Sequence, residues 1–153
     1  WNIFKEAGQP WGIGPGAPAT PERVESGLVS VGGDTDDETN PFEVRLGKYV
    51  NLDVPDDTVG IQALRRIHAE GVKRHQLGLV MDGAAPMPFG TRAEDILHNG
   101  EKVGKMTNST WSPRMKANIG FALISVSVTA GASVQVMRPG GPVAARLVEL
   151  PFL

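Results

Sequence analysis

From residue 74 onward, apolar and polar residues alternate in short runs that favour β-strands. We predict five or six strands, from the segments 75–81, 96–98, 102–106, 119–128, 134–137 and 143–150. The second and third are joined by Asn99-Gly100, a pair typical of a two-residue hairpin. Short strands at near-regular spacing predict a small antiparallel barrel or jelly roll. We expect the apolar tail 151–153 to pack against this barrel.

Before the barrel, the pattern changes to a helical one at 61–70, a run without Gly or Pro. Its apolar positions recur at helical spacing, at Ile61, Leu64 and Ile67. We expect Asp57 or Thr58 to cap the start of this helix and Gly71 to end it. Residues 1–7 are interpreted as the last turns of another helix. The Gly- and Pro-rich connector 9–21 is predicted to contain no helix or strand.

The stretch 23–50 places an acidic loop between two segments that we expect to be half-buried. Leu28, Val29 and Val31 precede the loop, and Asp34, Asp36, Asp37 and Glu38 form it. Counted from Asp34, the sixth and twelfth residues are Thr39 and Arg45, whereas a calcium-binding EF-hand needs Gly and Glu there. The loop is therefore predicted to be solvated. His68, His75 and His98 lack the spacing of zinc ligands, so no metal site is expected.

Composition narrows the classes of function. The 153 residues are 41% hydrophobic with a net charge of −2 and no cysteine. No basic stripe appears, so we expect no nucleic-acid partner. No apolar stretch reaches the roughly 20 residues of a membrane helix, and a soluble cytoplasmic protein is expected. Because the first residue is Trp1 and not Met, we also expect a preceding segment.

Three side chains are candidates for binding. Glu25 follows Arg23 by two residues, so on an extended segment both would share one face. They would form a surface salt bridge, or Glu25 would point into a pocket and accept two N–H donors from a flat heterocycle. Tyr49 is expected at a strand edge, and Trp111 on a loop as a packing anchor or a site residue.

Three blocks of the sequence resemble the tetrahydrofolate-dependent aminomethyltransferases, typified by the glycine cleavage T-protein. They are RVESGL followed by GGD, NPFE followed by Leu46, and VGKMT followed by SP and NIG. The resemblance implies an α+β chain that forms the end of a three-domain cloverleaf enzyme and closes in a C-terminal antiparallel β-barrel. Residues 1–72 would be the C-terminal part of the folate-binding core, with one helix, and 73–153 the barrel.

The resemblance also implies a cofactor and its contacts. Tetrahydrofolate would lie in a central channel, with the Glu25 carboxylate accepting the exocyclic amine and ring N–H of the pterin together. Tyr49 and Trp111 would line the channel. The catalytic acid is expected from the preceding, N-terminal portion of the same protein, so no catalytic residue is assigned.

Two departures from the T-protein pattern bear on whether the reaction is demethylation or aminomethyl transfer. Val31 stands where the family has Tyr, and the stretch 46–50 lacks its basic cluster. The sequence around GGDTD and NPFEVRL is more similar to the demethylase branch of the family. Members of that branch move a methyl group from a small O-, S- or N-methyl donor to tetrahydrofolate. The alternatives are an aminomethyltransferase of the glycine cleavage system and a non-catalytic barrel that binds a partner.

Overall fold

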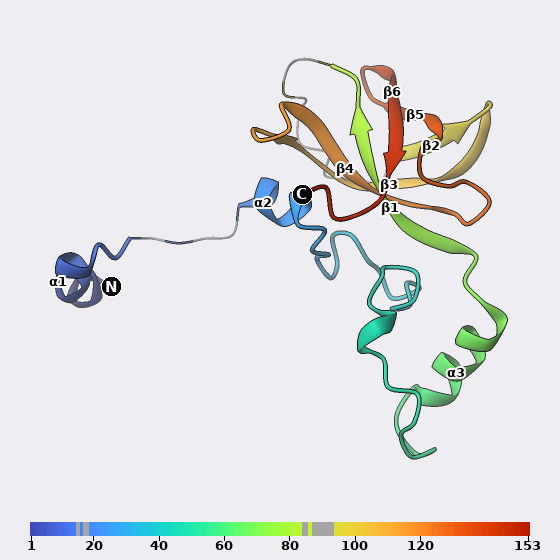
Figure 1. Cartoon of the computed structure of the whole chain (residues 1–153), viewed down its shortest axis with the longest axis horizontal. Helices are drawn as coiled ribbons and strands as arrows, with labels where there is room; N and C mark the ends of the chain where they lie inside the picture. The colour runs from blue at the N-terminus through green and yellow to red at the C-terminus, as the bar shows by residue number, and fades with distance from the viewer. Residues whose placement is uncertain (15, 17–18, 84–85, 87–93) are drawn as a thin grey trace.

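The computed structural model describes residues 1–14, 16, 19–83, 86 and 94–153. Its main feature is a closed barrel of six antiparallel strands in the order β1-β4-β3-β2-β5-β6 (Figure 1). The strands are β1 Arg74–Met81, β2 Glu94–His98, β3 Glu101–Ser112, β4 Ala117–Ser125, β5 Ser133–Arg138 and β6 Gly141–Val148. The predicted α+β chain with an antiparallel barrel is confirmed.

The barrel interior is filled by alternate residues of its strands. Leu77, Leu79 and Met81 of β1 pack there with residues of the other five strands. The hairpin between β2 and β3 turns at Asn99 and Gly100, whose φ angles of 53° and 84° match the left-handed turn that this pair predicts.

Two strand boundaries differ from the prediction by more than two residues. Strand β3 continues past 106 to Ser112, with a register shift between Met106 and Asn108 where it bends. Trp111 therefore lies in β3, and its predicted place on a loop is wrong. Strand β4 ends at Ser125, three residues before the predicted end.

The described residues of the N-terminal half form three α-helices, α1 Asn2–Gly8, α2 Thr20–Glu25 and α3 Ile61–Glu70, and two 3-10 turns, η1 Gln9–Trp11 and η2 Gly47–Tyr49. Helix α3 has the predicted bounds and ends at Gly71. Its start is capped by neither Asp57 nor Thr58; Gly60 occupies the N-cap in a left-handed conformation.

Turn η1 and the first two residues of α2 lie within 9–21, where we predicted a connector without helix or strand. Pro21 stands in the first turn of α2, where its fixed φ favours a helix and its missing N–H costs nothing. Arg23 and Glu25 are therefore helical, and the predicted extended segment is wrong.

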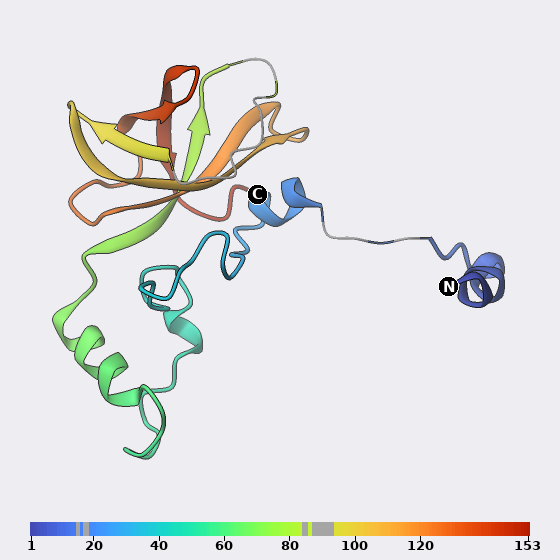
Figure 2. The same ribbon diagram turned by 180° about the vertical axis from the view of Figure 1, so that it is seen from behind.

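Helix α2 and the C-terminal tail cover the outer wall of the barrel (Figures 1 and 2). Val24 packs there against Ile119, Phe121 and Leu150, and all four are buried. Phe152 packs against the same group, whereas Leu153 is exposed. The predicted packing of the tail 151–153 against the barrel is therefore confirmed for Phe152.

Two other features of the N-terminal half bear on its surface. Leu28 and Val31 are exposed, the latter by 93%, so of the three apolar residues before the acidic loop only Val29 is half-buried as predicted. None of the helices in the described ranges is long and apolar enough to cross a bilayer.

The contact of β3 with β4 generates a prediction. A Cβ added at Gly104 would overlap the carbonyl oxygen of Leu123 and lie 2.7 Å from the Cα of Ile124, and neither backbone atom can move alone. We expect Gly104→Ala to lower the free energy of unfolding by about 1–3 kcal/mol, measured by urea denaturation.

Gly140→Ala is the matched control, because the same added atom meets nothing within 4 Å. It should change stability by less than about 0.5 kcal/mol. Equal unfolding midpoints for the two variants would contradict this account of Gly104.

Candidate functional site

The C-terminal turn of α2 directs three consecutive side chains toward different partners. Val24 enters the apolar group on the barrel wall. Arg23 lies over the ring of Phe121, with Cζ 5.7 Å from the ring centroid, and it forms an ion pair with Asp34. Residues two apart on a helix point about 200° from each other, so Arg23 and Glu25 do not share a face. The predicted salt bridge between them is wrong.

Glu25 is 2% exposed and is held by the barrel. The hydroxyl of Ser112 donates to Glu25 Oε1 at 2.6 Å, and the N–H of Met115 donates to Ser112 Oγ at 3.0 Å. The backbone of Glu25 is held as well, since the N–H of Phe152 donates to its carbonyl oxygen at 3.0 Å. Helix α2, strand β3 and the tail therefore meet at this residue.

The second carboxylate oxygen of Glu25, Oε2, has a more distant partner than Oε1. Within the described part of the chain it pairs with Arg114, whose Nε lies 3.6 Å away and whose side chain is 69% exposed. A carboxylate can accept about four hydrogen bonds, and Ser112 uses one of them. Chemically, the site can accept further N–H or O–H donors from a ligand.

The structure does not bring Tyr49 or Trp111 to Glu25. Tyr49 ends η2, not a strand, and its ring is 74% exposed beside the ammonium group of Lys48. Trp111 is half-buried on β3 next to Ser112. Successive strand residues point to opposite faces, so Trp111 faces away from the side on which Ser112 meets Glu25.

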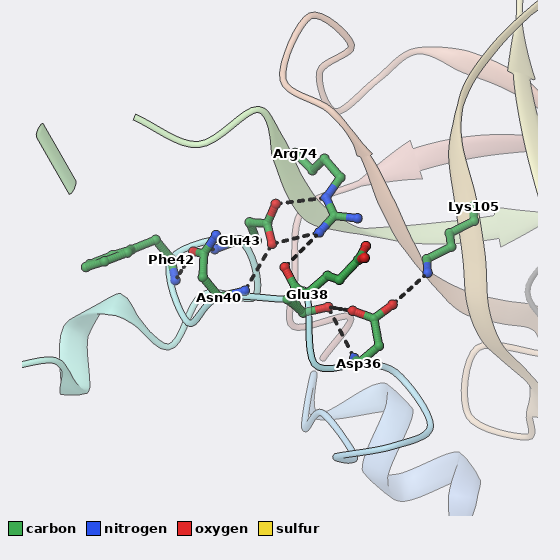
Figure 3. Close-up of polar contacts among 8 residues, drawn as sticks. Asp36, Glu38, Asn40, Phe42, Glu43, Arg74 and Lys105 are labelled. Carbon is green, nitrogen blue, oxygen red and sulfur yellow. Dashed lines mark hydrogen bonds and ion pairs between the residues drawn. The ribbon is translucent and has the colours of Figure 1, made fainter. Parts of the chain in front are cut away.

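The acidic loop after α2 is tied to neighbouring groups. Asp34 is buried, and its Oδ2 accepts from Arg23 and from the N–H of Ser30. Asp36 accepts from the hydroxyl of Thr39 and pairs with Lys105 of β3 at 3.1 Å (Figure 3). The prediction of a solvated loop is wrong for Asp34, which is buried, whereas Asp36, Asp37 and Glu38 are exposed as predicted.

A second ion pair joins the chain after this loop to β1. Glu43 is buried and accepts two hydrogen bonds from Arg74, at 2.8 and 3.0 Å (Figure 3). The N–H of Asn40 donates to the same carboxylate at 3.1 Å. The Glu43 carboxylate raises the pKa of the Arg74 guanidinium. Within the described ranges, no cluster of His, Asp and Glu could hold a metal ion.

Sequence reasoning missed Ser112, Lys105 and Arg74 as partners. Ser112 lies 87 residues from Glu25, Lys105 lies 69 from Asp36 and Arg74 lies 31 from Glu43. No periodicity links positions so far apart. The one available signal was that Ser112 belongs to the SP block of the resemblance.

Comparison with known proteins decides the family. The profile of the glycine cleavage T-protein C-terminal barrel domain matches residues 74–153. The chain belongs to this family.

Full-length relatives extend the similarity into the N-terminal half. The aminomethyltransferase of Synechococcus sp. (strain CC9902) is 36% identical over 131 residues, which are 85% of this chain and 35% of that protein. That of Parasynechococcus marenigrum (strain WH8102) is 34% identical over 154 residues, 99% of this chain and 40% of that protein. The chain thus spans well under half the length of these curated relatives.

A solved structure supports the fold. The crystal structure of the glycine cleavage system aminomethyltransferase T from Bartonella henselae superposes with a TM-score of 0.72 at 23% identity, covering 87% of this chain and 37% of that one. The family expected from the three sequence blocks is confirmed. The relatives' names favour the aminomethyltransferase alternative over the demethylase reading.

The Arg23–Asp34 pair generates a prediction about stability. In Asp34→Ala the largely buried guanidinium of Arg23 loses its counter-charge, and the Ser30 N–H loses its acceptor. We expect the free energy of unfolding to fall by about 3 kcal/mol in urea denaturation. Asp56→Ala is the control, because Asp56 pairs with Arg65 in the open, and its midpoint should not move. Similar losses in both variants would contradict the assignment.

The Asp36 cluster generates a prediction about pH. The Thr39 hydroxyl, followed by Lys105, lowers the pKa of Asp36 from 3.8 to about 2. The stabilisation that this carboxylate provides is therefore present above pH 3.8 and lost as the pH falls toward 2. Thr39→Val should raise the pKa of Asp36 toward 3.8 in an NMR titration of the carboxyl carbons. The pKa of Asp56, lowered by Arg65, should stay unchanged in the same spectra.

Proposed function

We propose that this chain is the C-terminal part of a tetrahydrofolate-dependent aminomethyltransferase, and that Glu25 holds the pterin edge of the cofactor. Membership in the T-protein family supports the reaction class. The observation that carries the role of Glu25 is its buried carboxylate, oriented by Ser112 and with acceptor capacity to spare. We assign residues 1–72 to the folate-binding core and 73–153 to the barrel domain.

The chemistry of a pterin explains why a carboxylate suits this position. A reduced pterin presents an exocyclic amine and a ring N–H side by side, and one carboxylate can accept both in a charge-assisted pair. Glu25 keeps lone pairs on both oxygens after the hydrogen bond from Ser112. A neutral amide would replace one acceptor with a donor that faces the pterin amine.

Tetrahydrofolate, when bound, supplies the amine nitrogens that take up the one-carbon unit. The contribution we assign to this chain is binding and orientation, which place the reacting atoms. The acid that assists the leaving group is proposed to come from the N-terminal portion of the protein. Tyr49 and Trp111 stay predictions as channel residues, and a cytoplasmic location stays one as well.

The proposed donor is an aminomethyl group on the lipoyl arm of a carrier protein. A demethylase acting on a small methyl donor is the second candidate. The observation in its favour is Val31, an exposed aliphatic residue where the T-protein pattern has Tyr.

Calorimetry with tetrahydrofolate tests the anchor. In the full-length protein, Glu25→Gln keeps the shape and the Ser112 contact but loses the charge. We expect it to weaken binding by roughly 1.5–3 kcal/mol, about 10- to 150-fold in Kd. Glu22→Gln is the matched control, an exposed glutamate on the same helix, and should bind as the wild type does. Equal affinity of the Glu25 variant and the wild type would remove the anchor role.

Parallel assays of the full-length protein separate the two reactions. We expect aminomethyl transfer from the loaded carrier protein and no demethylation of methoxyaromatic compounds. Demethylation alone would establish the second candidate. Absence of folate binding in the wild type would instead support a barrel that only binds a partner.

A further inference from the structure

We propose that Ser112 is a positioning residue for the cofactor: through its hydrogen bond it sets the orientation of the Glu25 carboxylate. The inference rests on the proposed role of Glu25 and adds to it a contribution from the barrel. Ser112 ends β3 and is fully buried, with 0% exposure. It therefore reaches the ligand only by acting on Glu25.

The direction of the Ser112 hydroxyl follows from its two neighbours. The N–H of Met115 can only donate, so Ser112 Oγ is the acceptor in that contact, at 3.0 Å. A carboxylate oxygen can only accept, so the Ser112 proton points at Glu25 Oε1, at 2.6 Å. This length is typical of a charge-assisted O–H···O⁻ bond. The backbone turn after β3 thus fixes the hydroxyl, and the hydroxyl fixes the carboxylate.

Fixing the carboxylate matters because of how a two-donor ligand binds. Both oxygens must lie in the plane of the ligand's two N–H groups for both bonds to form. A free glutamate side chain rotates about three bonds, and ordering it opposes binding. Ser112 holds Oε1 on the barrel side and leaves Oε2 toward the exposed guanidinium of Arg114. Affinity should then depend on a side chain that the ligand never touches.

A double-mutant cycle on tetrahydrofolate affinity tests this in the full-length protein. We expect Ser112→Ala to weaken binding by roughly 3- to 10-fold in calorimetry, the range of one hydrogen bond. In the Glu25→Gln background the same substitution should weaken binding by less than about twofold, because the carboxylate that Ser112 orients is already absent. A purely structural role would lower the unfolding temperature alike in both backgrounds without this coupling in Kd.

Two further variants make the result unambiguous. Ser112→Cys fills the same space with a weak donor, so it should show the affinity loss even if Ser112→Ala folds poorly. Ser125→Ala is the matched control. Ser112 pairs with Ala117 at the start of β4, whereas Ser125 ends that strand, and its hydroxyl pairs with Ser127 on the surface. Its affinity should equal that of the wild type.

The outcomes separate the two proposals. If Glu25→Gln loses affinity while Ser112→Ala and Ser112→Cys bind as the wild type does, the positioning role is wrong and the anchor stands. Equal losses from the Ser112 variants in both backgrounds also overturn positioning. If the wild type does not bind tetrahydrofolate, or Glu25→Gln binds equally well, the proposed function fails and the positioning role falls with it.

Discussion

The fold depends on covering an apolar wall on the outside of the barrel. Strand β4 is buried on both faces: Ala122 and Ile124 point into the interior, whereas Ile119 and Phe121 point out. The outward residues can leave water only if other segments lie over them, and burying a large side chain contributes about 1.5–3 kcal/mol. Helix α2 and the C-terminal tail provide that cover. The place of Glu25 follows from this, because it is the residue after Val24.

Ion pairs then fix the chain that leaves α2. Arg23 with Asp34, Lys105 with Asp36 and Arg74 with Glu43 connect this chain internally or to the barrel. Two of the three carboxylates, Asp34 and Glu43, are buried. Removing one partner of such a pair costs far more than the intact pair contributes, so these contacts define one arrangement more than they add stability. The acidic loop is solvated at Asp36, Asp37 and Glu38, as predicted, and it is also fixed in place through the pairs of Asp34 and Asp36.

The sequence predicted the barrel well because the signals of strands and turns lie within a few consecutive residues. Alternation in β1 and the Asn99-Gly100 turn are read within a few residues, and so is the spacing in α3. Helix α2 was missed because its six residues are too few for a helical period to show, and Pro21 resembled part of the connector. Arg23 and Glu25 were placed on an extended segment, which is wrong because both belong to α2.

The parts of the site that could not be predicted depend on tertiary contacts. Ser112 approaches Glu25 only when β3 is closed into the barrel and α2 lies on its wall. Exposure of Tyr49 and the face of Trp111 depend on the same arrangement. The residue types left Glu25 as half of a surface salt bridge or as a carboxylate for a flat ligand, and the resemblance implied the second role. Neither contained the distance to Ser112.

The tail gives the end of the chain an influence far from itself. The N–H of Phe152 holds the backbone of Glu25, and its ring and that of Phe121 belong to one apolar group. Residues 150–152 thus hold a helix that begins some 130 positions earlier in the chain. Shortening this segment would loosen α2, and with it the Glu25 carboxylate, without changing any residue of that helix.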